Sequence, residues 1–128
     1  MKMLEWIVET SGLIQLTFAV LLGWPIFLHR QSAFLQRVIP GRARLLQSHI
    51  DDIFMGILHI VLAGFVAKGG PILVGLFIFG SWMNAQIFLF LAFTNDACAS
   101  RAWFRIVTLV SFASLTIAYL WLLLLQFT

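Results

Sequence analysis

Charged residues are scarce in this chain. Only 10% of its 128 residues are Asp, Glu, Lys or Arg, whereas 62% are hydrophobic. A soluble domain carries roughly 25% charged residues, so this chain lacks the polar side chains needed to cover its surface in water. Its eight Lys and Arg residues form no basic stripe interleaved with aromatic residues, which excludes nucleic acid as a partner. The composition predicts an integral membrane protein of one domain, whose surroundings are the lipid bilayer.

Cysteine is almost absent as well. The single residue, Cys98, excludes an intrachain disulfide and every metal site of the CxxC type. Phosphate-binding glycine motifs are missing, and so is the GxSxG elbow of a serine hydrolase. The N-terminus has neither a strongly basic start nor a small-residue cleavage site, so we expect no removable signal peptide and a first apolar stretch that is retained as a helix.

What the chain does have is four long apolar stretches. A transmembrane helix needs about 20 predominantly apolar residues, and stretches of this kind cover residues 7–28, 46–67, 71–94 and 103–127. Strands are excluded because the runs are too long and because backbone in lipid must satisfy its hydrogen bonds within a helix or a closed barrel. The sequence predicts an all-α fold, a single four-helix transmembrane domain over residues 1–128.

Arginine is confined to two of the three loops. With four crossings the first and third loops share one side of the membrane and carry all six Arg, whereas the other side has Lys2 and Lys68. The positive-inside rule places the Arg loops in the cytoplasm and both termini outside, which in a bacterium means the inner membrane. His29 follows the first span among these arginines, where we expect it to be solvated at headgroup level.

The second span is unusual because it holds ionisable residues, which are costly inside a membrane and mark function by default. Asp51 and Met55 point away from the others. At about 100° per residue, the remaining polar and small residues fall within an arc of about 80°. This stripe consists of His49, Asp52, Gly56, His59 and Ala63. It is either a helix-packing seam with hydrogen bonds across it or a cofactor or substrate site.

The third span adds a second polar group. Ser81, Asn84 and Phe88 share one face by the same helical geometry, and Asn84 at bilayer depth needs a partner that the second span could supply. Trp82 and Gln86 can also be interpreted without a functional site, as an interfacial aromatic ring and an amide that reaches the headgroups. The group is therefore either part of a site or membrane packing.

The two histidines of the second span cannot share one metal. His49 and His59 are ten residues apart, which is about 15 Å along a straight helix. A single His that ligates haem iron between apolar helices is feasible. Thirteen Phe and five Trp could line such a site, although this number of aromatic residues is also typical of plain membrane packing.

Two segments resemble a known family. Residues 48–56 (SHIDDIFMG) resemble the second-helix motif of the hydroxylaminobenzene mutases and, more loosely, that of the styrene oxide isomerases. In that family a His at the start of the helix is followed by an acidic residue and, six and seven positions on, by Asn-Gly; His49, Asp51 and Gly56 match. Residues 80–84 (GSWMN) resemble the third-helix segment, in which Trp or Tyr precedes Asn by two positions.

The resemblance implies a cofactor and an activity. Styrene oxide isomerases are trimeric membrane proteins that bind haem b at the subunit interface through the His of the second helix. The resemblance therefore implies His49 as the iron ligand, Gly56 in the cofactor site, Arg42 and Arg44 as partners of the haem propionates, and a homotrimer. It also implies a redox-neutral rearrangement of a small hydrophobic substrate, an aromatic hydroxylamine or an epoxide, with the iron as Lewis acid.

Three positions depart from the family pattern. Met55 replaces the Asn before the matched Gly, Gly80 replaces an Asp, and Phe88 replaces a Tyr. If the protein is an enzyme, we expect a substrate pocket formed by Trp82, Phe88 and Met55, with catalytic groups from Asp52, Asn84, Ser81 and Gln86. Otherwise it binds haem without catalysis, or it is a haem-free membrane subunit whose polar stripe is only packing.

Overall fold

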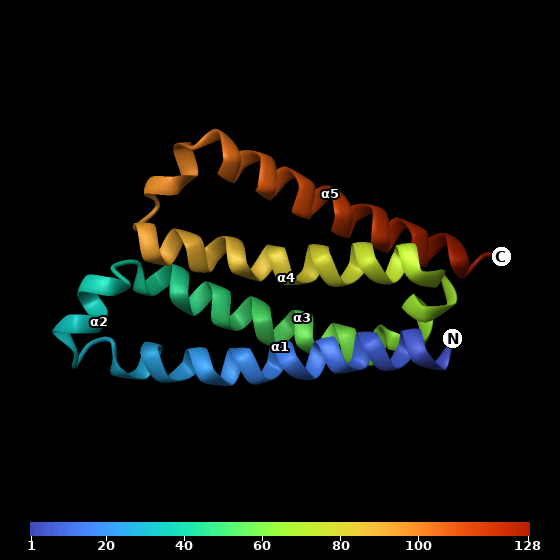
Figure 1. Ribbon diagram of the computed structural model, residues 1–128, viewed down its shortest axis with the longest axis horizontal. Coiled ribbons are helices and arrows are strands. Elements are labelled where there is room, and N and C mark those ends of the chain that lie inside the picture. Colours follow the sequence, from blue (N-terminus) through green and yellow to red (C-terminus); the bar gives the residue numbers. More distant parts are fainter.

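The computed structural model describes all 128 residues and is built of helices alone (Figure 1). Four of the helices are long and apolar enough to cross a membrane by length and composition. This confirms the predicted all-α fold with four membrane-spanning helices. In chain order the elements are α1 (Lys2–Leu28), α2 (Ala33–Val38), α3 (Arg42–Lys68), α4 (Gly70–Thr94), η1 (Ala97–Ser100) and α5 (Ala102–Leu125).

Several bounds of the long helices differ from those of the predicted apolar stretches. The first begins at Lys2 rather than at residue 7, and α3 begins at Arg42 rather than at residue 46. A helix satisfies its own backbone hydrogen bonds, so it can continue beyond the hydrocarbon core into the headgroup region. The last helix is shorter than its apolar stretch and ends at Leu125 rather than at Phe127.

Tight turns connect α3, α4 and η1. Gly70 has a φ of +81°, and Pro71 follows it in the first turn of α4. At the other end of α4, Asn95 and Asp96 both have positive φ, a conformation that Asn and Asp tolerate better than most residues. These turns reverse the chain, so that α4 packs antiparallel to α3 on one side and to α5 on the other.

Three of the long helices, α1, α3 and α4, pack on one another, while α5 packs on α4 and diverges from it toward η1 (Figure 1). Small residues make the closest approaches possible. A Cβ atom on Gly12 of α1 would lie 2.7 Å from the carbonyl oxygen of Gly56 in α3, and one on Gly80 would lie 2.9 Å from the backbone nitrogen of Leu115 in α5. Such small-residue contacts are typical of helix association in membranes.

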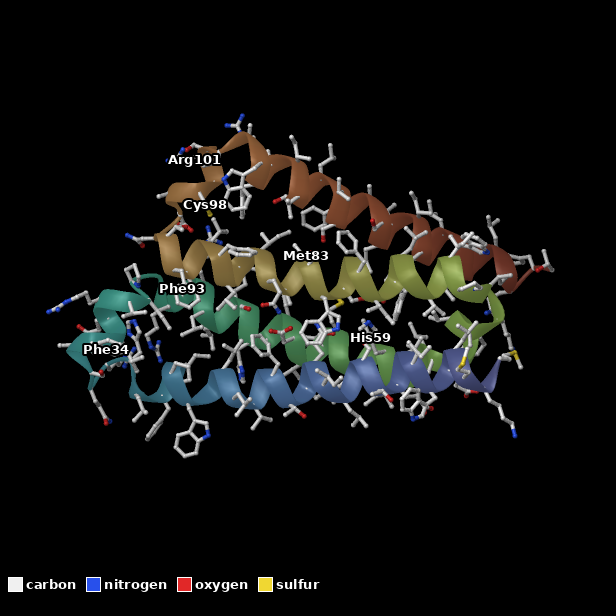
Figure 2. The ribbon with its side chains drawn as sticks, in the orientation of Figure 1. Phe34, His59, Met83, Phe93, Cys98 and Arg101 are labelled. Carbon is white, nitrogen blue, oxygen red and sulfur yellow. The ribbon has the colours of Figure 1, made fainter.

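Both termini lie at one end of the bundle, and α2 and η1 lie at the other (Figure 1). All six arginines belong to this second end, which we call the Arg end: Arg30, Arg37, Arg42, Arg44, Arg101 and Arg105. Figure 2 shows Phe34 and Arg101 there, on the two loops. The arginines and the two lysines therefore lie at opposite ends of the bundle.

The expectation for His29 is wrong. Its side chain is buried, with Nε2 donating a hydrogen bond to the carbonyl oxygen of Ile39 at 2.7 Å. The amide of Gln36 donates to the carbonyl oxygens of His29 and Arg30. These bonds hold α2, which lies in the loop between the first two spans, against the end of α1. His29 therefore stabilises a folded loop and is not solvated.

Candidate functional site

The polar stripe of α3 is buried as its helical spacing predicts. Asp52 and His59 are fully buried, and Gly56 and Ala63 are buried with them. Met55 and Asp51 are only partly buried, as expected for residues that point away. His49 lies at the edge of the stripe, where it is partly exposed. The stripe therefore has an interior part around Asp52 and a marginal part at His49.

The ring of His49 is held in a defined state by α1. Its Nδ1 lies 2.7 Å from the carbonyl oxygen of Ala19. A carbonyl oxygen can only accept, so Nδ1 carries the hydrogen and donates it, and in the neutral ring Nε2 keeps its lone pair. Histidines that ligate metals usually have this arrangement, in which the nitrogen that does not bind metal donates to a carbonyl or carboxylate.

An open apolar hollow of about 360 Å³ lies beside His49. It is lined by Val20, Gly23, Trp24 and Phe27, which follow one exposed face of α1. A Cβ atom on Gly23 would lie 3.7 Å from Cε1 of His49, so this glycine borders both the imidazole and the hollow. His49 is thus placed next to a lipid-facing concave surface rather than inside the bundle.

Of the two arginines predicted to pair with haem propionates, Arg44 forms an ion pair within the protein and Arg42 does not. Arg44 pairs with Asp96 through Nε at 3.0 Å and donates from Nη1 to Gln47. Arg42 forms no ion pair, and its Nε is buried without a hydrogen-bond partner. Arg42 precedes His49 by seven residues, which places it two turns, or about 10.5 Å, along the same side of α3.

Inside the bundle a polar junction joins three helices. Asp52 Oδ1 accepts hydrogen bonds from Nε2 of Gln15 at 3.0 Å and from Nε2 of Gln86 at 3.2 Å. Gln15 Nε2 also lies 3.5 Å from the carbonyl oxygen of Ser81. We call Gln15, Asp52, Ser81 and Gln86 the polar junction. Each of α1, α3 and α4 contributes to it, and Gln15, Asp52 and Ser81 are fully buried.

The hydrogen bonds of Gln86 and Trp82 correct the interpretation of both residues, and the junction adds one residue. Gln86 does not reach for headgroups, because it donates to Asp52; Trp82 is also tied inward, with Nε1 donating to Ser11 at 2.9 Å. Gln15 was missed by the sequence analysis. The sequence did contain a sign of its role, because a glutamine in an uncharged span must find a hydrogen-bond partner. The sequence does not identify that partner.

His59 lies in the interior among α1, α3 and α4 (Figure 2). Its ring packs against that of Phe77 with 5.0 Å between centroids, and neither ring nitrogen has a hydrogen-bond partner. The side-chain oxygens of Ser81 and Asn84 are also without partners. The hydrogen bond that the second span could supply to Asn84 is therefore not formed.

The predicted substrate-pocket residues lie apart from the hollow beside His49. Trp82 packs on Phe18 with 6.1 Å between ring centroids, and Phe88 packs against a cluster that contains Cys98. Met55 lies on α3 and is partly buried. Gly56 faces Gly12 at the α1–α3 contact, two turns from His49. Contact of Met55, Trp82 or Phe88 with a substrate stays a prediction.

No group of three or more His, Cys, Asp or Glu side chains lies close enough together to hold a metal ion. A metal bound by such side chains of one chain would therefore have at most two of them as ligands.

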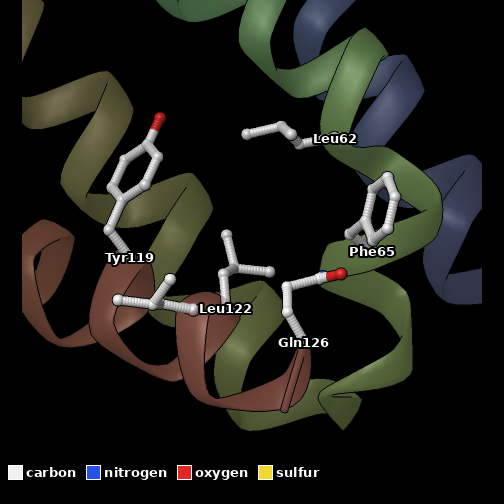
Figure 3. A pocket seen from close by; sticks show the side chains of 6 residues that line it. Leu62, Phe65, Tyr119, Leu122 and Gln126 are labelled. Atoms are coloured by element: carbon white, nitrogen blue, oxygen red, sulfur yellow. The ribbon is translucent and has the colours of Figure 1, made fainter.

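A second groove, of about 350 Å³, lies between α3 and α5 and is lined by residues that include Leu62, Phe65, Tyr119 and Gln126 (Figure 3). This groove is near the end of the bundle opposite to His49.

Comparison with known proteins gives no match to a family model, a curated protein or a solved structure.

Proposed function

We propose that this protein is a membrane-embedded, haem-dependent isomerase or mutase that rearranges a small hydrophobic substrate without net redox change. The observation that carries the proposal is the hydrogen bond from His49 Nδ1 to the Ala19 carbonyl oxygen, which leaves Nε2 free to ligate iron. The activity is the one implied by the resemblance of residues 48–56 and 80–84 to the hydroxylaminobenzene mutases and styrene oxide isomerases.

The residues around His49 fit haem b. The cofactor is flat and largely apolar, and Val20, Trp24 and Phe27 provide an apolar wall beside the ligand. Haem also carries two propionates, and the unpaired guanidinium of Arg42 lies on the same side of α3 toward the Arg end. One imidazole, an apolar wall and one free guanidinium would match the iron, the ring and one of the two propionates.

The other two histidines of the chain would not reach an iron held by His49. His29 donates to Ile39, and His59 is enclosed in the bundle about 15 Å from His49 along α3. One chain thus offers a single ligand to the iron. When bound there, haem would supply a Lewis acid for an N–O or C–O bond of the substrate.

The chain's own residues then have distinct tasks. His49, whose ring orientation is set by Ala19, would hold the iron. Trp24 and Phe27 would exclude water, and Arg42 would bind a propionate. Because the hollow is open, a neighbouring copy is needed to enclose the cofactor, which agrees with the homotrimer implied by the resemblance. Asp52, Ser81 and Asn84 remain candidate catalytic groups without a contact to the hollow.

Absorption spectra of detergent-purified protein test the proposal. The native protein should show a Soret band, His49→Ala should lose it, and His59→Ala should keep it, because His59 is remote from the hollow. Arg42→Gln should lower haem retention without changing the ligand. The native protein should also convert phenylhydroxylamine into an aminophenol, measured by chromatography. A full and unshifted Soret band in His49→Ala protein would rule out the site.

A further inference from the structure

Asp52 forms no ion pair with a positively charged side chain. Its carboxylate is fully buried in the middle of the bundle, and its hydrogen-bond partners are the neutral amides of Gln15 and Gln86. The one ion pair of the molecule joins Arg44 and Asp96 at the Arg end. Amide hydrogen bonds lower the energy of a buried carboxylate but do not cancel its charge, and an uncompensated buried ion is strongly unfavourable. Something else must neutralise Asp52.

Three buried side chains near Asp52 in the bundle carry oxygen atoms without hydrogen-bond partners. Oε1 of Gln15 and the Oγ atoms of Ser81 and Ser48 have no hydrogen-bond partner, and all three side chains are fully buried. Gln15 touches Asp52 directly and contacts the backbone of Ser81. Ser48 precedes Asp52 by one turn on the same face of α3. Oδ2 of Asp52 accepts only a long contact of 3.4 Å from Gln86. Buried polar atoms are normally satisfied, so these oxygens point to a ligand.

We propose that the polar junction, together with Ser48, binds one Na⁺ ion. The donor set consists of oxygen alone, which hard cations prefer, and it offers no sulfur and no imidazole nitrogen. It carries a single negative charge, so one monovalent ion neutralises it, whereas Ca²⁺ or Mg²⁺ would leave an excess positive charge in the membrane. The inference goes beyond the proposed function, because it requires neither haem nor a substrate.

A bound ion would join three helices. Gln15, Asp52 and Ser81 belong to α1, α3 and α4, so one bound ion links the three helices that form the centre of the bundle. In a membrane the hydrophobic effect does not hold helices together, and polar contacts contribute to their association. Na⁺ should therefore stabilise the folded protein by binding it and not the separated helices.

Thermal unfolding of the detergent-purified protein tests the site. The melting temperature is measured at constant pH and ionic strength while choline chloride is replaced by NaCl, with KCl in a parallel series. We expect an upward shift in Tm that saturates with Na⁺ and is smaller with K⁺. Asp52→Asn should abolish the shift. Asp51→Asn is the matched control, since it removes the neighbouring carboxylate, which lies outside the junction, and should leave the shift intact.

A Tm that does not depend on Na⁺ would overturn the proposal and show that a proton neutralises Asp52. An undiminished shift in Asp52→Asn protein would place the ion elsewhere. If Asp52→Asn fails to fold, Ser81→Ala serves instead: it keeps the charge, and it should raise the Na⁺ concentration at half-shift, whereas an unchanged midpoint contradicts the assignment. The same titration of His49→Ala protein should give the native response, which separates failure of this proposal from failure of the haem proposal.

Discussion

The contact between α1 and α3 at Gly12 allows the effect of one methyl group to be worked out from the structure. A Cβ atom at this position would lie 2.7 Å from the carbonyl oxygen of Gly56, 2.7 Å from Cβ of His59 and 3.1 Å from Cγ1 of Ile60. Non-bonded carbon atoms are best separated by about 3.5–4.0 Å. The first two atoms belong to or adjoin the backbone and cannot rotate away, so Gly12→Ala must push the two helices apart.

The expected cost follows from two opposing effects. Overpacking of this kind costs about 1–3 kcal/mol, while alanine gains up to about 1 kcal/mol in helix propensity over glycine. We expect Gly12→Ala to lower the free energy of unfolding by about 1–2 kcal/mol, because packing is a main source of helix association in membranes.

Gly75→Ala is the matched control, because Gly75 also lies inside a long helix and its Cβ would have no neighbour within 4 Å. This substitution keeps the gain in propensity and adds no clash, so stability should be unchanged or slightly higher. Titration with SDS in mixed micelles measures both variants against the native protein. If Gly12→Ala and Gly75→Ala unfold at the same SDS fraction, the helices are not in the close contact described and the reasoning fails.

The Arg end should face the cytoplasm, because six Arg with one paired Asp lie there, whereas the opposite end has two Lys and two Glu. Alkaline phosphatase fused after Thr128 should be active and a green fluorescent protein fused there should be dark; the reverse pattern would contradict this orientation. Asp96→Asn should lower the free energy of unfolding by less than about 1 kcal/mol, since the side chains of Arg44 and Asp96 are 40% and 52% exposed. A severalfold larger loss in SDS titration would show that the pair is shielded from water and salt.

Properties that depend on one helix alone were predictable from the sequence. Long apolar stretches gave the four crossings, because a helix must be about 20 residues long to span the bilayer. Helical periodicity gave the buried face of α3, and Asp52, His59 and Ala63 are all fully or almost fully buried while Asp51 is not. Such inferences succeed because the geometry of a single helix varies little.

Properties that depend on two elements were not predictable. Periodicity shows that Asp52 faces the interior, but the register of α1 against α3 decides that Gln15 is its partner. The same is true of Gln86, whose spacing also fits an interfacial amide. For α2, the hydrogen bond from His29 to Ile39 closes a loop whose polar composition suggested solvation. In each case the missing quantity is the relative position of two segments.

The rotation of α3 about its own axis connects the two proposed sites. His49 and Asp52 are three residues apart, so their side chains differ in direction by about 60°. The hydrogen bonds of Asp52 to Gln15 and Gln86 fix the rotation of α3. At this rotation the side chain of His49 points to the carbonyl oxygen of Ala19 at the margin of the bundle. The interior junction thus sets the direction of the exposed imidazole without touching it. This division explains why a costly buried carboxylate and a partly exposed histidine occur within one turn of the same membrane helix.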